Sequence, residues 1–184
     1  VKYGAIGVIV RSMTLRLDDY PHTGGLTYGN LPLSKRIPAA AISTNGADKL
    51  SNLLKIKPDL KFLFRQQCKQ LPDVKSYNVI AEKKGSEYPN EIILIGGHLD
   101  SWDTGDGSHD DGAGVVHSMD LLNIFNSINY IPKRTIRIVL YINEENGGRG
   151  SEKYKEISDK QKLNHIFAIE SDLSLIHISE PTRH

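Results

Sequence analysis

The sequence predicts an α/β fold: a three-layer α/β/α domain preceded by a smaller, β-rich region. After Ser76, apolar strand-like segments alternate with segments of helical periodicity. This alternation is typical of a largely parallel sheet covered by helices. In addition, three of the apolar segments are followed at once by His, Asp or Glu, the residue types that bind metal ions. The sequence therefore predicts a metal site at one edge of the sheet.

The smaller region covers residues 1 to about 75 and contains short apolar segments separated by loops rich in Gly, Pro and Thr. Two of these segments, 5–10 and 37–43, are typical of short strands. Thr44 or Asn45 follows the second segment and is a suitable N-cap for a short helix.

The rest of this region contains one more strand pattern and no group of candidate catalytic residues. Leu60, Phe62 and Phe64 alternate with polar residues, which predicts a half-buried strand. Pro72-Asp73 marks the expected boundary between the two regions, and no catalytic constellation precedes it.

The larger region, 76–172, has the pattern of a catalytic domain built on a sheet. Val115, Met119 and Leu122 recur at helical spacing, and Pro132 ends the connection that follows them. The expected strands are 77–82, 92–96, 136–142 and 166–169, and the expected helices are 113–125 and 151–158.

Composition excludes several classes of function. The net charge is +1 with no basic block, so nothing indicates binding to nucleic acid. No apolar run reaches the ~20 residues that span a bilayer. Cys68 is the only cysteine, which excludes an internal disulfide and a cysteine zinc cage. The chain begins with Val1 inside an expected strand and is interpreted as an internal piece of a longer protein.

The candidate ligands follow the strands, where ligand sites of open α/β sheets lie. His98 offers a ring nitrogen, and Asp100 is placed to fix its tautomer. Asp110 ends a Gly-rich loop just before a helix, where one carboxylate can bridge two cations. The remaining acids are Glu144, Glu145 and Asp172. If Glu145 coordinates, its neighbour Glu144 is the natural general base.

Other kinds of site fit the sequence less well. An EF-hand starting at Asp106 fails, because Asp111 takes the position that needs Gly and His117 the position of the closing Glu. There is no phosphate-binding loop and no nucleophile elbow. Four further histidines are expected in loops or at the surface rather than as ligands: His22, His109, His117 and His165.

The acidic motifs together resemble the two-zinc aminopeptidase/carboxypeptidase family. The segments that carry the resemblance are 98–103, 109–114, 144–148 and 170–172, with 132–137 ahead of the Glu-Glu strand. Segments 21–24 and 37–42 resemble the protease-associated domain inserted in those enzymes. The resemblance implies a zinc exopeptidase domain over 76–172, incomplete at its C-terminal side, and a protease-associated domain over 1–75, truncated at its N-terminal side.

The resemblance also implies a role for each matching residue. Asp110 would bridge two zinc ions, His98 and Asp172 would complete one site, and Glu145 would bind the other ion. Glu144 would be the general base and Asp100 a second catalytic residue. The Asp110-Asp111 peptide bond would be cis, and a fifth ligand, a histidine, would lie far downstream.

The end of the chain departs from this pattern. Residues 173–184 are interpreted as a non-native tail, and His177 is poorly spaced to replace the downstream histidine. The resemblance implies hydrolysis of unblocked dipeptides or short peptides, a secreted or lysosomal protein, and a homodimer, with the 184-residue chain itself inactive. The alternatives are a catalytically dead receptor-type relative that acts as a binding module, and a glutaminyl cyclase-like acyltransferase.

Overall fold

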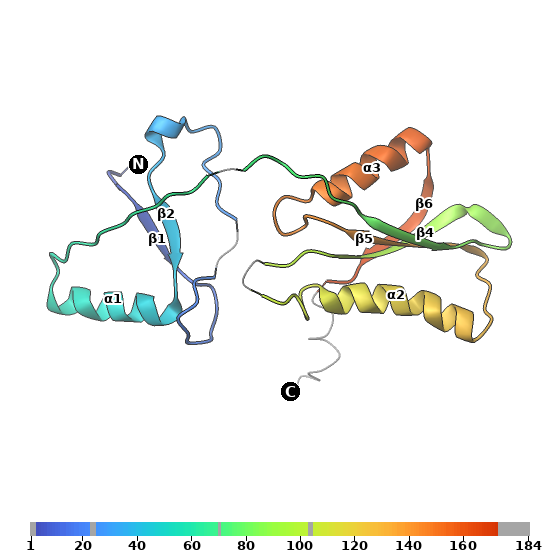
Figure 1. Ribbon diagram of the computed structural model, residues 1–184, viewed down its shortest axis with the longest axis horizontal. Helices are drawn as coiled ribbons and strands as arrows, with labels where there is room; N and C mark the ends of the chain where they lie inside the picture. The colour runs from blue at the N-terminus through green and yellow to red at the C-terminus, as the bar shows by residue number, and fades with distance from the viewer. Residues whose placement is uncertain (1–2, 23–24, 70, 103–104, 173–184) are drawn as a thin grey trace. The chain divides into compact units, whose positions relative to one another are not determined.

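The computed structural model describes residues 3–22, 25–69, 71–102 and 105–172. The chain forms two compact units, Val1–Pro72 and Asp73–His184. Figure 1 shows the elements of each unit. The tail predicted at 173–184, including His177, lies outside the described residues.

The first unit contains two short parallel strands, β1 (Val8–Arg11) and β2 (Ala39–Ile42). A 3₁₀ turn (Leu33–Lys35) precedes β2, and helix α1 (Thr44–Ile56) follows it. The N-cap of α1 is Ser43, whose hydroxyl accepts a hydrogen bond from the Gly46 amide at 3.0 Å. The prediction of Thr44 or Asn45 as cap was wrong.

The side chain of Thr44 instead points into the interior of the first unit. Its side chain is fully buried, and its hydroxyl oxygen accepts a hydrogen bond from the Asp18 amide at 2.8 Å. This contact ties the start of α1 to the loop after β1, so the hydroxyl that could have capped the helix holds the loop instead.

The strand predicted from Leu60, Phe62 and Phe64 is absent from the described residues of this segment. A strand needs a backbone partner, and here the contact with β2 is made by a side chain: the Gln66 amide group donates to the Ala39 carbonyl at 2.8 Å. With 13 residues in α1 and four in each strand, the described part of this unit is mixed α/β rather than β-rich. Its identity as a protease-associated domain stays a prediction.

The second unit is a four-stranded sheet in the order β3-β5-β4-β6, with two helices. Strands β4, β5 and β6 are mutually parallel, and β3 is an antiparallel edge strand, so the sheet is mixed. The elements are β3 (Val79–Lys83), β4 (Tyr88–His98), α2 (Gly112–Ser127), β5 (Arg134–Tyr141), α3 (Arg149–Gln161) and β6 (Asn164–Glu170).

The two helices lie on opposite faces of this sheet (Figure 1). On the α2 face, Ile136, Ile138 and Leu140 of β5 form the core. On the α3 face, Tyr154 packs with Val139 and Tyr141. Because side chains alternate along β5, its odd and even positions serve different helices. The unit thus has three layers, and the predicted mixed α/β fold is confirmed.

Candidate metal centre

The carboxyl ends of three parallel strands meet at one edge of the sheet. His98 at the end of β4 lies opposite Tyr141 at the end of β5, and Gly96 lies opposite Glu170 of β6. The pairing continues past the strands: the Leu99 amide donates to the Tyr141 carbonyl at 2.6 Å. This register brings the three acidic segments that follow the strands to one place.

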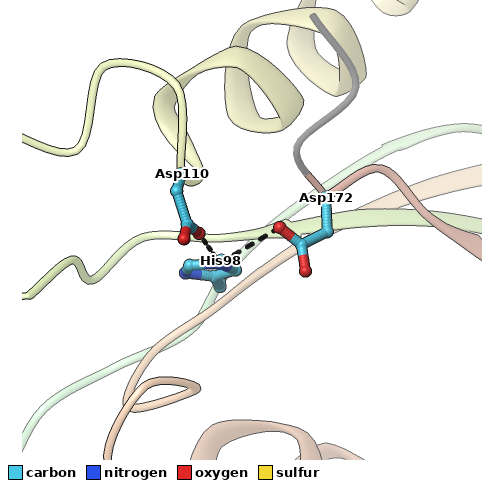
Figure 2. A group of neighbouring side chains, drawn as sticks. All are labelled: His98, Asp110 and Asp172. Atoms are coloured by element: carbon cyan, nitrogen blue, oxygen red, sulfur yellow. Dashed lines mark hydrogen bonds and ion pairs between the residues drawn. The ribbon is translucent and has the colours of Figure 1, made fainter. Parts of the chain in front are cut away.

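His98, Asp110 and Asp172 converge there (Figure 2). The Nε2 atom of His98 lies 3.1 Å from Asp110 Oδ1 and 3.8 Å from Asp172 Oδ1. One donor atom from each residue falls within 4.8 Å of the others, close enough for a single ion to contact all three. The imidazole is only 1% exposed, whereas the two carboxylates are 40% and 50% exposed.

The ring of His98 is oriented by the backbone. Its Nδ1 atom lies 2.9 Å from the Asp100 carbonyl oxygen, which only accepts, so Nδ1 carries the proton. The Nε2 lone pair of the neutral ring then points toward the carboxylates, as metal binding requires. Burial lowers the pKa of His98, but the Asp100 carbonyl and the nearby carboxylates outweigh it and raise the pKa. This surplus of negative charge around one imidazole also favours a cation.

Both acids after β5 reach the same place. Glu144 Oε2 lies 3.9 Å from His98 Nε2. Glu145 Oε1 is buried and has no hydrogen-bond partner among the described residues. Burial and then the charge of Asp110 raise the pKa of Glu145. A buried carboxylate oxygen without a donor needs a cation or a proton, so Glu145 fits the role of metal ligand.

Asp100 makes a different contact from the one expected. Its carboxylate Oδ1 is 3.9 Å from His98 Nδ1, and its backbone carbonyl instead accepts the hydrogen bond from the ring Nδ1–H. The carboxylate accepts the backbone N–H groups of Glu144 at 2.9 Å and Glu145 at 3.1 Å. The reason is the course of the loop after β4. It directs the Asp100 carbonyl toward the His98 ring and the Asp100 side chain toward the loop after β5.

Asp111 is a buried residue to which the sequence assigned no role in the site. It is 1% exposed, and its Oδ2 accepts the His98 backbone N–H at 2.9 Å. Its Oδ1 accepts the Gly114 N–H at 3.0 Å and so caps α2. Burial raises the pKa of Asp111 against the effect of these hydrogen bonds. The signal was present in the sequence, because Asp directly before a helix is a typical N-cap. The Asp110-Asp111 peptide bond is cis, as the resemblance implies.

Gly114 in α2 and Gly97 in β4 are required because other atoms lie very close to them. A Cβ at Gly114 would overlap the Ser171 carbonyl oxygen and the Asp111 carboxylate, and one at Gly97 would lie 2.6 Å from Asp111 Oδ2.

We expect Gly114→Ala to lower the free energy of unfolding by at least ~1–3 kcal/mol, because backbone must move to admit the methyl group. Urea denaturation followed by circular dichroism measures this. Gly105→Ala is the control, since a Cβ there meets only ordinary contacts. Equal stability of the two variants would contradict the close packing.

The other histidines of the described residues lie outside the His98 group. His165 is in β6, where its Nε2 atom lies 2.8 Å from the Tyr154 hydroxyl on the α3 face.

The donor set fits zinc. One neutral imidazole and the carboxylates of Asp110 and Asp172 supply the N and O ligands that zinc takes. Glu145, with its unpartnered buried oxygen, is a further carboxylate at this edge that could hold a cation. The predicted site residues His98, Asp110, Glu144, Glu145 and Asp172 therefore lie around one edge of the sheet.

One buried histidine with carboxylates at the carboxyl edge of an α/β/α sheet supplies the residue types of a metal centre. The chain belongs to peptidase family M28, whose model matches residues 78–177.

Curated relatives of the same family extend over both units. Carboxypeptidase Q of Xenopus laevis is 38% identical over 94% of this chain, and that of Homo sapiens is 36% identical over 93%. A probable leucine aminopeptidase 2 of Aspergillus oryzae is 34% identical over 50% of this chain and 18% of its own length. The chain spans about 36% of the length of the carboxypeptidase Q relatives.

A solved structure shares the fold. The peptidase M28 precursor of Shewanella amazonensis superposes with a TM-score of 0.77 at 38% identity. The match covers 92% of this chain and 38% of that one.

Proposed function

We propose that the full-length protein is a zinc-dependent exopeptidase of the carboxypeptidase or dipeptidase type, acting on unblocked dipeptides or short peptides. The observation that carries the proposal is the convergence of the donor atoms of His98, Asp110 and Asp172 within 4.8 Å. Membership of peptidase family M28 supports a metallo-exopeptidase. We propose the carboxypeptidase type because the relatives that match most of this chain are named carboxypeptidase Q.

Four residues would hold the metal ions. His98, Asp110 and Asp172 would bind one zinc, and Asp110 with Glu145 would bind the second. When bound there, the zinc ions would supply Lewis-acid chemistry, polarising the scissile carbonyl and lowering the pKa of the attacking water.

Glu144 would move the proton. Its carboxylate is 47% exposed, so water and substrate can reach it, and its Oε2 faces the same space as His98 Nε2. In this role the carboxylate takes a proton from the attacking water and passes it to the amine nitrogen that leaves. The charge of Glu144 is restored at the end of the cycle, so one residue serves both steps.

The cellular location and the oligomeric state are proposed from the family resemblance alone. We propose that the full-length protein is secreted or lysosomal and forms a homodimer. No helix in the described part of the chain is long and apolar enough to cross a membrane.

The test is a peptidase assay on a full-length protein that contains this chain. We expect dipeptides with free termini to be hydrolysed, N-acetylated dipeptides to be poor substrates, and dialysis against a chelator to abolish activity until zinc is restored. Tight peptide binding without turnover would instead support a receptor-type relative. Cyclisation of peptides with N-terminal glutamine, without hydrolysis, would support the acyltransferase.

Zinc titration of the 184-residue chain gives a second expected result. Its described residues offer one complete set of three donors but only Asp110 and Glu145 for the second ion, one short of the usual three protein ligands. We expect one zinc to bind by calorimetry, and no dipeptide turnover. Two tightly bound ions with turnover would contradict this and would mean that another residue, such as His177, completes the second site.

A further inference from the structure

We propose that Asp100 is a positioning residue for the Glu144–Glu145 turn, acting through backbone amides rather than through the His98 ring. Its two carboxylate oxygens accept one N–H group each, from Glu144 at 2.9 Å and from Glu145 at 3.1 Å. Hydrogen bonds to an ionised carboxylate are roughly twice as strong as neutral ones. The side chain that sets the direction of both acids is therefore on the neighbouring loop.

The turn is closed by its own hydrogen bonds, but these leave the two amides free. The Gly148 amide donates to the Asn143 carbonyl at 2.7 Å, and the Gly147 amide to the Glu144 carbonyl at 3.2 Å. The N–H groups of Glu144 and Glu145 point away from these bonds and converge on Asp100. Successive N–H groups that converge in this way form a concave anion-binding site.

The contact is held in register by the strands. The Leu99 amide donates to the Tyr141 carbonyl at 2.6 Å, so the loop that carries Asp100 leaves β4 directly beside the end of β5. The Asp100 side chain is 16% exposed, so most of the accepting carboxylate is shielded from water.

Side chain and backbone of Asp100 have separate tasks. The His98 ring is fixed by the Asp100 carbonyl at 2.9 Å, and a side-chain substitution keeps that carbonyl. Loss of the carboxylate would therefore release the Glu144–Glu145 turn while His98 stays oriented. This gives two results that differ from those of a residue acting on the imidazole.

The first experiment measures amide hydrogen exchange in the 184-residue chain by NMR and needs no activity. In Asp100→Ala the amides of Glu144 and Glu145 should exchange about 10- to 100-fold faster, while the Gly148 amide keeps its protection. Asp100→Asn keeps one acceptor oxygen and should deprotect mainly one of the two. Asp120→Asn, an exposed acid on α2, is the matched control and should change neither. Unchanged exchange at both amides in Asp100→Ala would overturn the proposal.

The second experiment measures turnover in the full-length enzyme and rests on the proposed function. Misdirection of Glu144 should lower kcat at least 10-fold in Asp100→Ala, with KM within about 2-fold, and Asp100→Asn should recover part of the loss. A larger effect on binding of the first zinc, together with an altered His98 Nδ1–H signal, would mean that Asp100 acts on the ring and would overturn the proposal. If the enzyme hydrolyses no peptide but the two amides still lose protection, the proposed function fails and the positioning role stands.

Should Asp100→Ala not fold, Asp100→Asn carries the test alone. It is nearly isosteric with Asp, and the proposal requires at least one of the two amides to lose protection in it. Protection of both amides at the wild-type level in Asp100→Asn would then contradict the role of the charged carboxylate.

Discussion

Replacing Glu144 by Gln in the full-length enzyme is expected to lower kcat by about 10²–10⁴-fold, the range typical of general acid–base catalysis. Gln keeps the shape of Glu144 and can still accept a hydrogen bond, but it cannot take up a proton from water at neutral pH. The backbone amide of residue 144 would still be held by Asp100, so the turn should keep its geometry.

Zinc content separates the possible roles of Glu144. If it is the base, Glu144→Gln should retain nearly all bound zinc, measured by atomic absorption on the purified protein. The matched control is Glu152→Gln in the first turn of α3, where the side chain is exposed. Near-normal activity of Glu144→Gln would rule out the base, and loss of zinc would make Glu144 a ligand.

Replacing Asp110 by Ala is expected to have the largest effect on metal binding. Asp110 lies 3.1 Å from His98 Nε2, and it is the residue proposed to bind both ions. Removing a residue that only supports a ligand typically costs 10–100-fold in metal affinity, and removing a shared ligand should cost more. We expect zinc content to fall from two ions to at most one, and peptide hydrolysis to fall to background.

The matched control for Asp110 is Asp106→Asn in the same loop. Asp106 is exposed and lies outside the group of metal-binding residues in the described part of the chain. It should retain both zinc ions and activity. Full zinc content in Asp110→Ala would contradict its role as the shared ligand.

The position of the site was predictable because it depends on local sequence and on a general property of sheets. Ligands follow apolar strands, and parallel strands place their carboxyl ends together, so His98 and Asp172 could be expected near each other before the structure was known. The alternation of apolar strand-like segments with helical segments along the chain likewise indicated a sheet covered by helices.

What could not be predicted depends on backbone groups that have no signature in the sequence. The Asp100 carboxylate accepts hydrogen bonds from two amides of another loop, while the Asp100 carbonyl accepts one from His98. Both contacts depend on how the two loops turn, which the sequence does not indicate. The alternation of Leu60, Phe62 and Phe64 failed for a related reason, because periodicity shows which side chains are apolar but not whether a partner strand is present.

The most direct test of the account is anomalous X-ray scattering at the zinc edge from crystals of the full-length protein. We expect two peaks about 3.5–4 Å apart, the usual separation in two-metal sites, on either side of Asp110. One peak should contact His98 and Asp172, and the other should contact Glu145. A single peak away from Asp110, or peaks bound by residues other than these four, would contradict a two-zinc centre built on Asp110.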